Sequence, residues 1–598
     1  MSNRQSLKSI LIVSVLVAVL GHPCVSETNP VTPDRTGKVV ADFQLKTHRG
    51  GEFDLAKVEQ PIVVLAFLGT ECPLVKLYGP RLNELQNEFA DRGVAIFGIN
   101  ANTQDSVTDI DGYMARHGIS FPILKDTANR IADQLGAERT PEVFLLDKER
   151  RIRYHGRIDD QYLVGLSREE PKRRDLAEAI NELLDGKSVS VASTEVVGCH
   201  IGRVSKVEPT GDITYTKHIA QIFNKRCVEC HRDGEIAPFT LTSYDDVIGW
   251  EDTIVEVIED KRMPPWFANP DHGKFHNDAR LSDEEKELIF TWVENGMPQG
   301  DPTDMPPPPT FVKGWRIPKP DQIIHCSEQP VFVKAQGVID YKYFEIDPGW
   351  TEDKYITAAE ARPGTSSVVH HIIAYVRPPG TEEFDFKHAQ MVVGYAPGSD
   401  PTLLRNGVAM RVPAGSKLLF EMHYTPNGSE QTDHSYIGIK FTDKSKVTKE
   451  LRGGVAIQPE FEIPPHADNH EVVAYYRSKR DELLLDMTPH MHLRGKAFRY
   501  EAIYPNGSKE VLLDLPRYDF NWQLSYELAE PKLLPKGTVI RCTGWYDNST
   551  KNPVNPEPNK PVRWGRQSWE EMMIGFFTTV DADQAADAAR KSNGTIVR

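Results

Sequence analysis

The chain has only one long hydrophobic run and no excess of positive charge. Ile10 to Leu20 is an apolar run, broken only by Ser14, with the length of a signal-peptide core and too short for a permanent membrane-spanning helix. The formal net charge of −16 argues against nucleic acid or an anionic membrane as a partner. The sequence also has no internal repeat of solenoid length. We therefore expect no integral span after signal cleavage, no nucleic-acid partner and no repeat array.

The apolar run has the flanks of a secretory signal peptide. Arg4 and Lys8 precede it, and cleavage near Ser26 would remove residues 1–26 together with Cys24. The Gly-His-Pro before Cys24 is a poor match to a lipidation site. We therefore expect a periplasmic or secreted protein, in an oxidising compartment where disulfides persist.

The length of the chain predicts several domains. With 598 residues, of which 39% are hydrophobic and 26% charged, it is far too long for one hydrophobic core. A polar stretch from Gly186 to Thr194 and a proline run from Pro306 to Pro309 mark composition shifts, the second being a stiff spacer. After the signal peptide, the predicted domains cover residues 36–187, 213–302, 310–450 and 451–598.

The second of these domains contains the pentapeptide Cys227-Val-Glu-Cys230-His231. Two thiols three positions apart, followed at once by an imidazole, form the pattern that attaches c-type haem. The thiols would form thioethers to the porphyrin, and His231 would supply one axial ligand of the iron. A structural zinc site would need a second ligand pair nearby, and none follows at the usual spacing.

The rest of this domain is predicted to be helical. Apolar residues recur at helical spacing between Tyr244 and Glu259, and Ser282 and Glu285 form a capping box that opens another helix, which Gly296 ends. Met263 is the favoured second axial ligand and Met297 the competing one. Residues 213–302 resemble a small all-α cytochrome c domain of the kind fused into exported bacterial proteins.

The first domain alternates predicted strands and helices. Residues 61–69, 94–100 and 142–147 are predicted strands, and the apolar positions Leu82, Leu85 and Phe89 mark a helix between the first two. This order predicts an α/β fold with a parallel sheet.

Two features of the first domain resemble the thioredoxin-like fold, close to its redoxin branch. Cys72 stands between a strand and a helix, and Thr140-Pro141 precedes a strand. The resemblance implies a cis Pro141 facing a redox-active Cys72, whose thiolate the helix dipole favours. Val75 replaces the second cysteine of a thioredoxin motif, so a disulfide inside the motif is impossible. Cys199 is either a distant resolving thiol or a structural or free cysteine.

Histidines are the main signal in the last two domains. His370-His371, His423, and His490-Met-His492 all lie in runs rich in strand-forming residues. In a strand, His490 and His492 point to one face, as two ligands of one metal ion should. His370 and His371 point to opposite faces of a regular strand, so they can share a metal only where the strand bends or ends. Sets of imidazoles, with or without a thioether, are typical of copper sites.

The order of these motifs resembles the type II copper monooxygenases, the family of peptidylglycine alpha-hydroxylating monooxygenase and dopamine beta-monooxygenase. The resemblance implies two all-β, jelly-roll-like domains that each hold one copper ion. The electron-transfer copper would be bound by His370, His371 and His423. The oxygen-activating copper would be bound by His490, His492 and Met572, with Met573 as the alternative to Met572.

Two departures from that family concern its substrate and a disulfide. Thr488 stands where the peptide-modifying enzyme has an arginine for the substrate carboxylate, so peptide amidation is not implied. Met573 stands where the family has a disulfide-forming cysteine. Cys542 therefore lacks that partner, and Cys326 is its remaining candidate.

Together these features predict an exported copper-dependent monooxygenase that hydroxylates a small molecule with O2. Its cofactors would be haem c as an electron relay and two copper ions, and a periplasmic electron donor is a possible partner. One alternative is a thiol peroxidase or disulfide reductase centred on Cys72, with the haem and copper domains as relays. Another is a non-catalytic copper and haem carrier.

Overall fold

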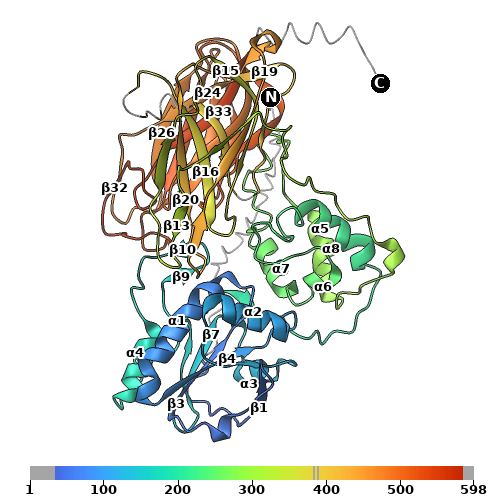
Figure 1. Cartoon of the computed structure of the whole chain (residues 1–598), viewed down its shortest axis with the longest axis vertical. Helices are drawn as coiled ribbons and strands as arrows, with labels where there is room; N and C mark the ends of the chain where they lie inside the picture. Colours follow the sequence, from blue (N-terminus) through green and yellow to red (C-terminus); the bar gives the residue numbers. More distant parts are fainter. Residues whose placement is uncertain (1–33, 382–383, 385, 387–389, 397, 583–598) are drawn as a thin grey trace, which may run out of the picture.

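The structure is a computed structural model that describes residues 34–582 apart from 382–383, 385, 387–389 and 397. Figure 1 shows three regions: an α/β domain (blue), a helical domain (green) beside it, and a large β region (yellow to red). None of the helices described is long and apolar enough to cross a membrane. The predicted signal peptide, residues 1–26, lies outside the described residues.

The α/β domain is built on one sheet of seven strands. In spatial order these are β2 (Glu52–Asp54), β1 (Gln44–Thr47), β5 (Ile123–Lys125), β4 (Val94–Asn100), β3 (Ile62–Phe67), β7 (Glu142–Leu146) and β8 (Ile152–Gly156). The helices of this domain are α1 (Pro73–Phe89), α2 (Val107–His117), α3 (Arg130–Leu135) and α4 (Asp175–Leu184).

The predicted strands of this domain are confirmed, but the sheet is mixed rather than parallel. Every residue of β3 is buried, because apolar clusters cover both faces of the sheet. β3, β4 and β5 are parallel, whereas β7 and β1 add antiparallel at the two sides. The chain passes from β5 through α3 to cis Pro141 and enters β7 from the opposite end, so β7 runs antiparallel to β3.

The helical domain confirms one of the two predicted helices and divides the other. It contains a π-helical turn (Tyr215–Ile219), α5 (Ala220–Arg226), α6 (Tyr244–Val247), α7 (Glu251–Glu259) and α8 (Asp283–Glu294). The single helix predicted between 244 and 259 is two helices, because the chain turns at Gly249, whose φ is +94°. Ser282 and Glu285 form the predicted capping box, and Gly296 ends α8 with a φ of +74°.

The first part of the β region has two main sheets. In the first sheet the spatial order of strands is β12 (Gln322–His325), β22 (Tyr436–Phe441), β15 (Lys354–Arg362), β19 (Val408–Val412) and β23 (Lys449–Glu450). The short strand β18 (Thr402–Leu403) also pairs with β15. The other orders β14 (Lys342–Ile346), β20 (Lys417–Tyr424), β16 (Val369–Arg377) and β17 (Gln390–Tyr395). A small sheet pairs β13 (Val331–Val333) with β21 (Gln431–Asp433). Apolar side chains of the strands form one core.

The second part repeats this plan with two four-stranded sheets. One orders β24 (Arg452–Ile457), β33 (Ile574–Asp581), β27 (Glu482–His490) and β30 (Tyr526–Leu534). The other orders β26 (His470–Arg477), β31 (Val539–Tyr546), β28 (Gly495–Ile503) and β29 (Lys509–Leu515). Short β25 (Glu462–Ile463) and β32 (Val562–Arg563) pair beside them. The change from one pair of sheets to the next falls between β23 and β24.

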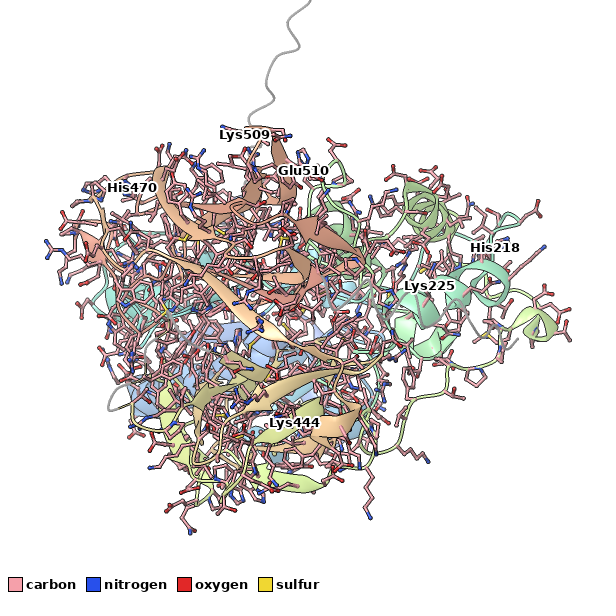
Figure 2. All side chains as sticks on the ribbon, turned by 90° about the horizontal axis from the view of Figure 1, so that it is seen from above. His218, Lys225, Lys444, His470, Lys509 and Glu510 are labelled. Carbon is pink, nitrogen blue, oxygen red and sulfur yellow. The ribbon has the colours of Figure 1, made fainter. Side chains whose placement is uncertain are left out.

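The helical domain is attached to the second β part by an inserted segment. Figure 2 shows this domain at one side of the molecule, with His218 and Lys225 away from His470 and Lys509 of the β region. Trp266, Phe267 and Phe275, which follow α7, are buried in the core of the second β part. Apolar side chains that follow α7 are therefore part of the core of the second β part.

Candidate functional site

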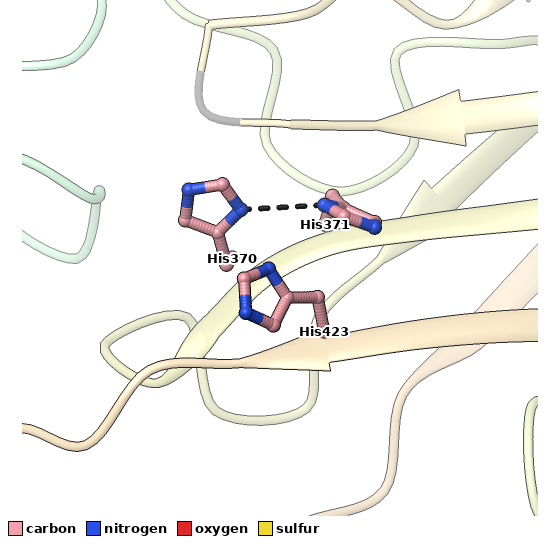
Figure 3. Close-up of side chains that lie close together, drawn as sticks. All are labelled: His370, His371 and His423. Carbon is pink, nitrogen blue, oxygen red and sulfur yellow. Dashed lines mark hydrogen bonds between the residues drawn. The ribbon is translucent and has the colours of Figure 1, made fainter. Parts of the chain in front are cut away.

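Three histidines gather at the end of two paired strands in the first β part. His370 and His371 lie on β16 and His423 lies on β20, and their candidate ligand nitrogens are all within 4.8 Å of one another (Figure 3). The pairing of β16 with β20 shifts register between Val369 and His371, which marks a bulge at His370. The bulge turns the side chains of His370 and His371 toward one point. It is the bend in the strand that the sequence predicted as the condition for a shared metal ion.

The nitrogens of this cluster are suited to a metal ion. The Nδ1 atoms of His370 and His371 face each other at 3.3 Å. Among the described residues, Nε2 of His370 and Nδ1 of His423 are buried without a hydrogen-bond partner. Burial lowers the pKa of His370 to about 3 and that of His423 well below its usual value, so both rings are neutral at pH 7. Unpartnered neutral imidazoles in a protein interior are donors for a metal ion.

A buried carboxylate, Glu421, borders this cluster. It lies two positions before His423 on β20, and its Oε1 is 3.5 Å from Nε2 of His371. Burial raises the pKa of Glu421, but its contact with His371 outweighs burial and lowers the pKa overall. Glu421 is therefore ionised and orients His371. Its signal in the sequence was a carboxylate between the apolar residues Phe420 and Met422 of the strand.

The second histidine pair lies where β27 ends. His490 is the last residue of β27 and His492 follows it in the turn, so the prediction that both lie in one strand is wrong. Their ring centroids are nevertheless 5.2 Å apart. Nδ1 of His490 is 2.7 Å from Oε1 of Gln523, and Nδ1 of His492 donates to the Glu570 carbonyl at 3.2 Å. Each contact leaves the Nε2 lone pair available for a metal.

Met572 is tied to this pair through the neighbouring Glu571. The Glu571 carboxylate accepts the backbone N–H of His492 at 2.9 Å and that of Met572 at 3.3 Å. Met572 lies in an apolar cluster with Tyr375 and Leu419 of the first β part. Met573 instead packs in the core of the second β part. Of the two methionines, Met572 therefore faces the boundary between the two β parts.

Two aromatic side chains border both histidine sets. The ring centroid of Tyr341 lies 4.5 Å from that of His423 and 5.9 Å from that of His492. Phe520 lies 5.8 Å from His423 and 6.1 Å from His492. The structure thus brings the five histidines predicted as ligands to one place, at the boundary between the two β parts. Tyr341 and Phe520 gave no recognisable signal in the sequence.

The Cys-x-x-Cys-His motif follows α5 in the helical domain. Nδ1 of His231 donates to the Phe239 carbonyl at 3.0 Å, so its Nε2 lone pair is available. Cys227 and Cys230 are free thiols whose pKa burial raises to about 12 and about 11. These groups fit covalent attachment of a porphyrin and ligation of its iron.

The two candidate axial methionines lie in different surroundings. Met297 is 4% exposed and belongs to the core of the helical domain. Met263 is half-buried and precedes a cis Pro264. The preference for Met263 stays a prediction.

Cys72 occupies the position predicted for a redox thiol. It is the N-cap residue of α1, it is 1% exposed, and its Sγ is 3.1 Å from the carbonyl oxygen of Thr140, which precedes cis Pro141. The cis bond and its position facing Cys72 are therefore confirmed. Cys199, on the short strand β11 (Cys199–His200), lies against Cys72. Of the two alternatives left open for Cys199, this placement favours the distant resolving thiol over a cysteine elsewhere in the fold.

Cys326 and Cys542 do not form the disulfide considered for them. Both are buried free thiols, Cys326 in the core of the first β part and Cys542 in that of the second. Separate cores hold the two sulfur atoms apart, so this pairing is wrong.

Comparison with known proteins identifies the first domain. Residues 36–155 match the model of the AhpC/TSA family. The thiol-disulfide oxidoreductase ResA of Halalkalibacterium halodurans is 29% identical over 133 residues, covering 22% of this chain and 71% of that protein. ResA of Geobacillus thermodenitrificans is 27% identical over 144 residues, covering 24% of this chain and 82% of that protein. The first domain is a thioredoxin-like redoxin domain of the oxidoreductase class.

A crystal structure of a hypothetical protein from Sinorhizobium meliloti is also similar in sequence. It is 31% identical, with a TM-score of 0.26, and the match covers 28% of this chain and 95% of that one. Each of these matches covers less than a third of the chain.

Proposed function

We propose that the protein is an exported copper-dependent monooxygenase that hydroxylates a small molecule with O2. The observation that carries the proposal is the convergence of His370, His371 and His423, with nitrogens within 4.8 Å, next to a second histidine pair. A cluster of imidazoles without carboxylate ligands favours copper over magnesium or calcium. Bound copper would supply one-electron chemistry and an open position for O2.

The residues of the chain would prepare the two sites differently. Glu421 orients His371, and the three imidazoles suit an ion that only exchanges electrons. Gln523 and the Glu570 carbonyl hold His490 and His492, while Met572 would add a soft thioether that favours the reduced ion. Tyr341 and Phe520 place aromatic rings beside both sets, which would limit access of water to bound copper.

Oxygen consumption tests this proposal. We expect the copper-loaded protein, with ascorbate as chemical reductant, to consume oxygen, and His490→Ala to abolish this activity. His470→Ala, which changes a histidine on β26, should consume oxygen at the wild-type rate. A protein that binds copper but consumes no oxygen would support the carrier function instead.

Gln523→Ala should weaken copper binding at the second site. Gln523 is the only described side chain that hydrogen-bonds Nδ1 of His490, at 2.7 Å. Loss of such a partner of a ligand typically lowers metal affinity roughly 10–100-fold. Competition with a copper chelator measures this change, and Gln134→Ala in the redoxin domain is the matched control. Equal affinity in both variants would contradict the role of Gln523.

The helical domain is proposed to be a c-type cytochrome that relays electrons. Cys227 and Cys230 would attach haem c, His231 would bind the iron, and Met263 is the favoured second ligand. Haem would supply one-electron transfer at a tunable potential. A periplasmic electron donor and a small-molecule substrate are the proposed partners.

Cys227→Ala and Cys230→Ala should each sharply reduce covalent haem, because one thioether must then hold the porphyrin alone. Haem that survives acid–acetone extraction, followed by absorbance, measures this loss. Cys326→Ala, at a buried cysteine in the β region, should retain full haem. Full retention in both motif variants would contradict the cytochrome assignment.

A second candidate function is thiol–disulfide exchange or peroxide reduction at Cys72. The position of Cys72 at the start of α1, opposite cis Pro141, favours it. Turnover of a disulfide or a peroxide that Cys72→Ala abolishes, without oxygen consumption, would support this function over the monooxygenase. Either function is consistent with export to the periplasm or beyond.

A further inference from the structure

A short strand, β11, from the linker segment between the redoxin and helical domains covers the edge of the redoxin domain beside Cys72. β11 pairs antiparallel with β6 (Arg139–Thr140), so that Cys199 lies opposite Thr140 and His200 opposite Arg139. The approach is close: a Cβ atom on Gly198 would lie 2.0 Å from the Thr140 carbonyl oxygen. Only glycine fits there, since the φ of Gly198 is +147°. The linker is therefore closely fitted to the edge that faces Cys72.

This pairing brings two thiols together. The Cys199 side chain packs against the core cluster that contains Cys72, and Sγ of Cys72 lies 3.1 Å from the carbonyl oxygen of Thr140, the residue that pairs with Cys199. Cys72 is 1% exposed, whereas Cys199 is partly exposed. A reagent approaching from solvent therefore meets Cys199 and its strand before it meets Cys72.

The two thiols differ in acidity. Burial raises the pKa of Cys72, but hydrogen bonds from the thiol and backbone N–H of Cys199 and from the N–H of Val75 lower it to about 6. The pKa of Cys199 is raised, first by its hydrogen bond to Cys72 and then by burial. The contact therefore favours the thiolate on Cys72 and the proton on Cys199. Thiol–disulfide exchange uses a nucleophile and a second thiol in this arrangement.

We propose that Cys72 and Cys199 form a reversible dithiol–disulfide couple, in which the linker strand supplies the resolving thiol that Val75 cannot. The Cys72 thiolate attacks one sulfur of a substrate disulfide, forming a mixed disulfide and releasing one thiolate, which takes up a proton. Cys199 then loses its proton to solvent and attacks the sulfur of Cys72, so that the second substrate thiol leaves and is protonated. The substrate gains two electrons and the couple loses two. The proposal rests on the thiol-exchange function of Cys72 and is independent of copper.

Access to Cys72 depends on the helical domain. β11 must separate from β6 before a substrate reaches Cys72, and α7 holds both strands. Oε2 of Glu256 is 2.6 Å from Nε2 of His200 and 2.6 Å from Nη2 of Arg139. The backbone N–H of His200 also donates to Oγ1 of Thr253 at 3.1 Å. Glu256 thus links the strand beside Cys72 to the haem-motif domain.

Peptide mapping of the full-length protein tests the couple. The reduced protein is equilibrated with glutathione and glutathione disulfide at about 0.1 mM, alkylated, and mapped by mass spectrometry without reduction. An intramolecular thiol acts at an effective concentration in the millimolar range, so the Cys72–Cys199 disulfide should exceed glutathionylated Cys72 by roughly tenfold. In Cys199→Ser, glutathione should instead remain on Cys72. Cys326→Ser, at a buried thiol elsewhere, should match the wild type.

Two outcomes separate failure of the couple from failure of the exchange function. If Cys72 exchanges with glutathione equally in the wild type and in Cys199→Ser, the couple is wrong and exchange at Cys72 stands. If Cys72 never exchanges in the wild type, both are wrong. The wild-type map alone decides the question if Cys199→Ser does not fold, because absence of the Cys72–Cys199 peptide overturns the couple.

A charge variant tests the access route. Glu256→Gln should accelerate formation of the disulfide, because it weakens the contacts of α7 with His200 and Arg139. Glu259→Gln, at an exposed position of the same helix, is the matched control and should keep the wild-type rate. Equal rates in the two variants would overturn the role of α7 in access to the couple.

Discussion

Met572→Ile should lower oxygen consumption by roughly 100-fold or more while the protein stays folded. The substitution removes the thioether proposed as a copper ligand. Loss of even a residue that only orients a ligand typically lowers metal affinity or activity roughly 10–100-fold. Isoleucine nearly fills the same apolar space beside Tyr375 and Leu419, so the stability cost should be below about 1.5 kcal/mol. An oxygen electrode and thermal unfolding measure the two effects.

Met573→Ile is the matched control for this variant. Met573 is fully buried in the core of the second β part, so its replacement should change stability and leave turnover nearly intact. The copper at the first site should still be reduced in Met572→Ile, as electron paramagnetic resonance would show. If instead Met573→Ile abolishes turnover and Met572→Ile does not, the assignment of the two methionines is reversed.

His423→Ala should reduce the copper content from two ions per chain to one. Two imidazoles on adjacent residues would remain at the first site, one donor fewer than the three that converge there. The second site should keep its copper, because His490 and His492 have their own partners in Gln523 and Glu570. Oxygen consumption should then fall strongly, since the ion that resupplies an electron is missing.

Elemental analysis of the purified variant measures this loss. His434→Ala is the control, since His434 stacks on His325 at 3.9 Å between ring centroids and hydrogen-bonds a backbone carbonyl. It should keep both copper ions. Loss of both ions from His423→Ala, in a protein that remains folded, would contradict two separate sites.

Local signals predicted many elements of the fold correctly. The apolar run of β3, the capping box of α8 and the glycine that ends it depend on neighbouring residues, which the sequence displays directly. The direction of β7 depends instead on which strand it pairs with and how the chain reaches it. A pattern along one strand carries no such information, so the sheet was predicted parallel and is mixed.

The candidate sites divide in the same way. The histidines and Met572 were identified by residue type and order, but the convergence of His370 and His371 depends on a bulge at His370 in the pairing of β16 with β20. Gln523 and Tyr341 reach the histidines from loops, just before β30 and β14, and neither belongs to a motif. Cys199 meets Cys72 only because β11 pairs with β6. Contacts between distant segments are the part that one sequence does not predict.

Copper titration of the metal-free, full-length protein tests the central claim most directly. The titration is followed by elemental analysis after removal of free metal, with zinc present as competitor. Imidazole and thioether ligands should favour copper, so we predict two copper ions bound per chain and zinc excluded from both sites. No bound copper, or zinc bound in preference at both sites, would contradict the copper monooxygenase function.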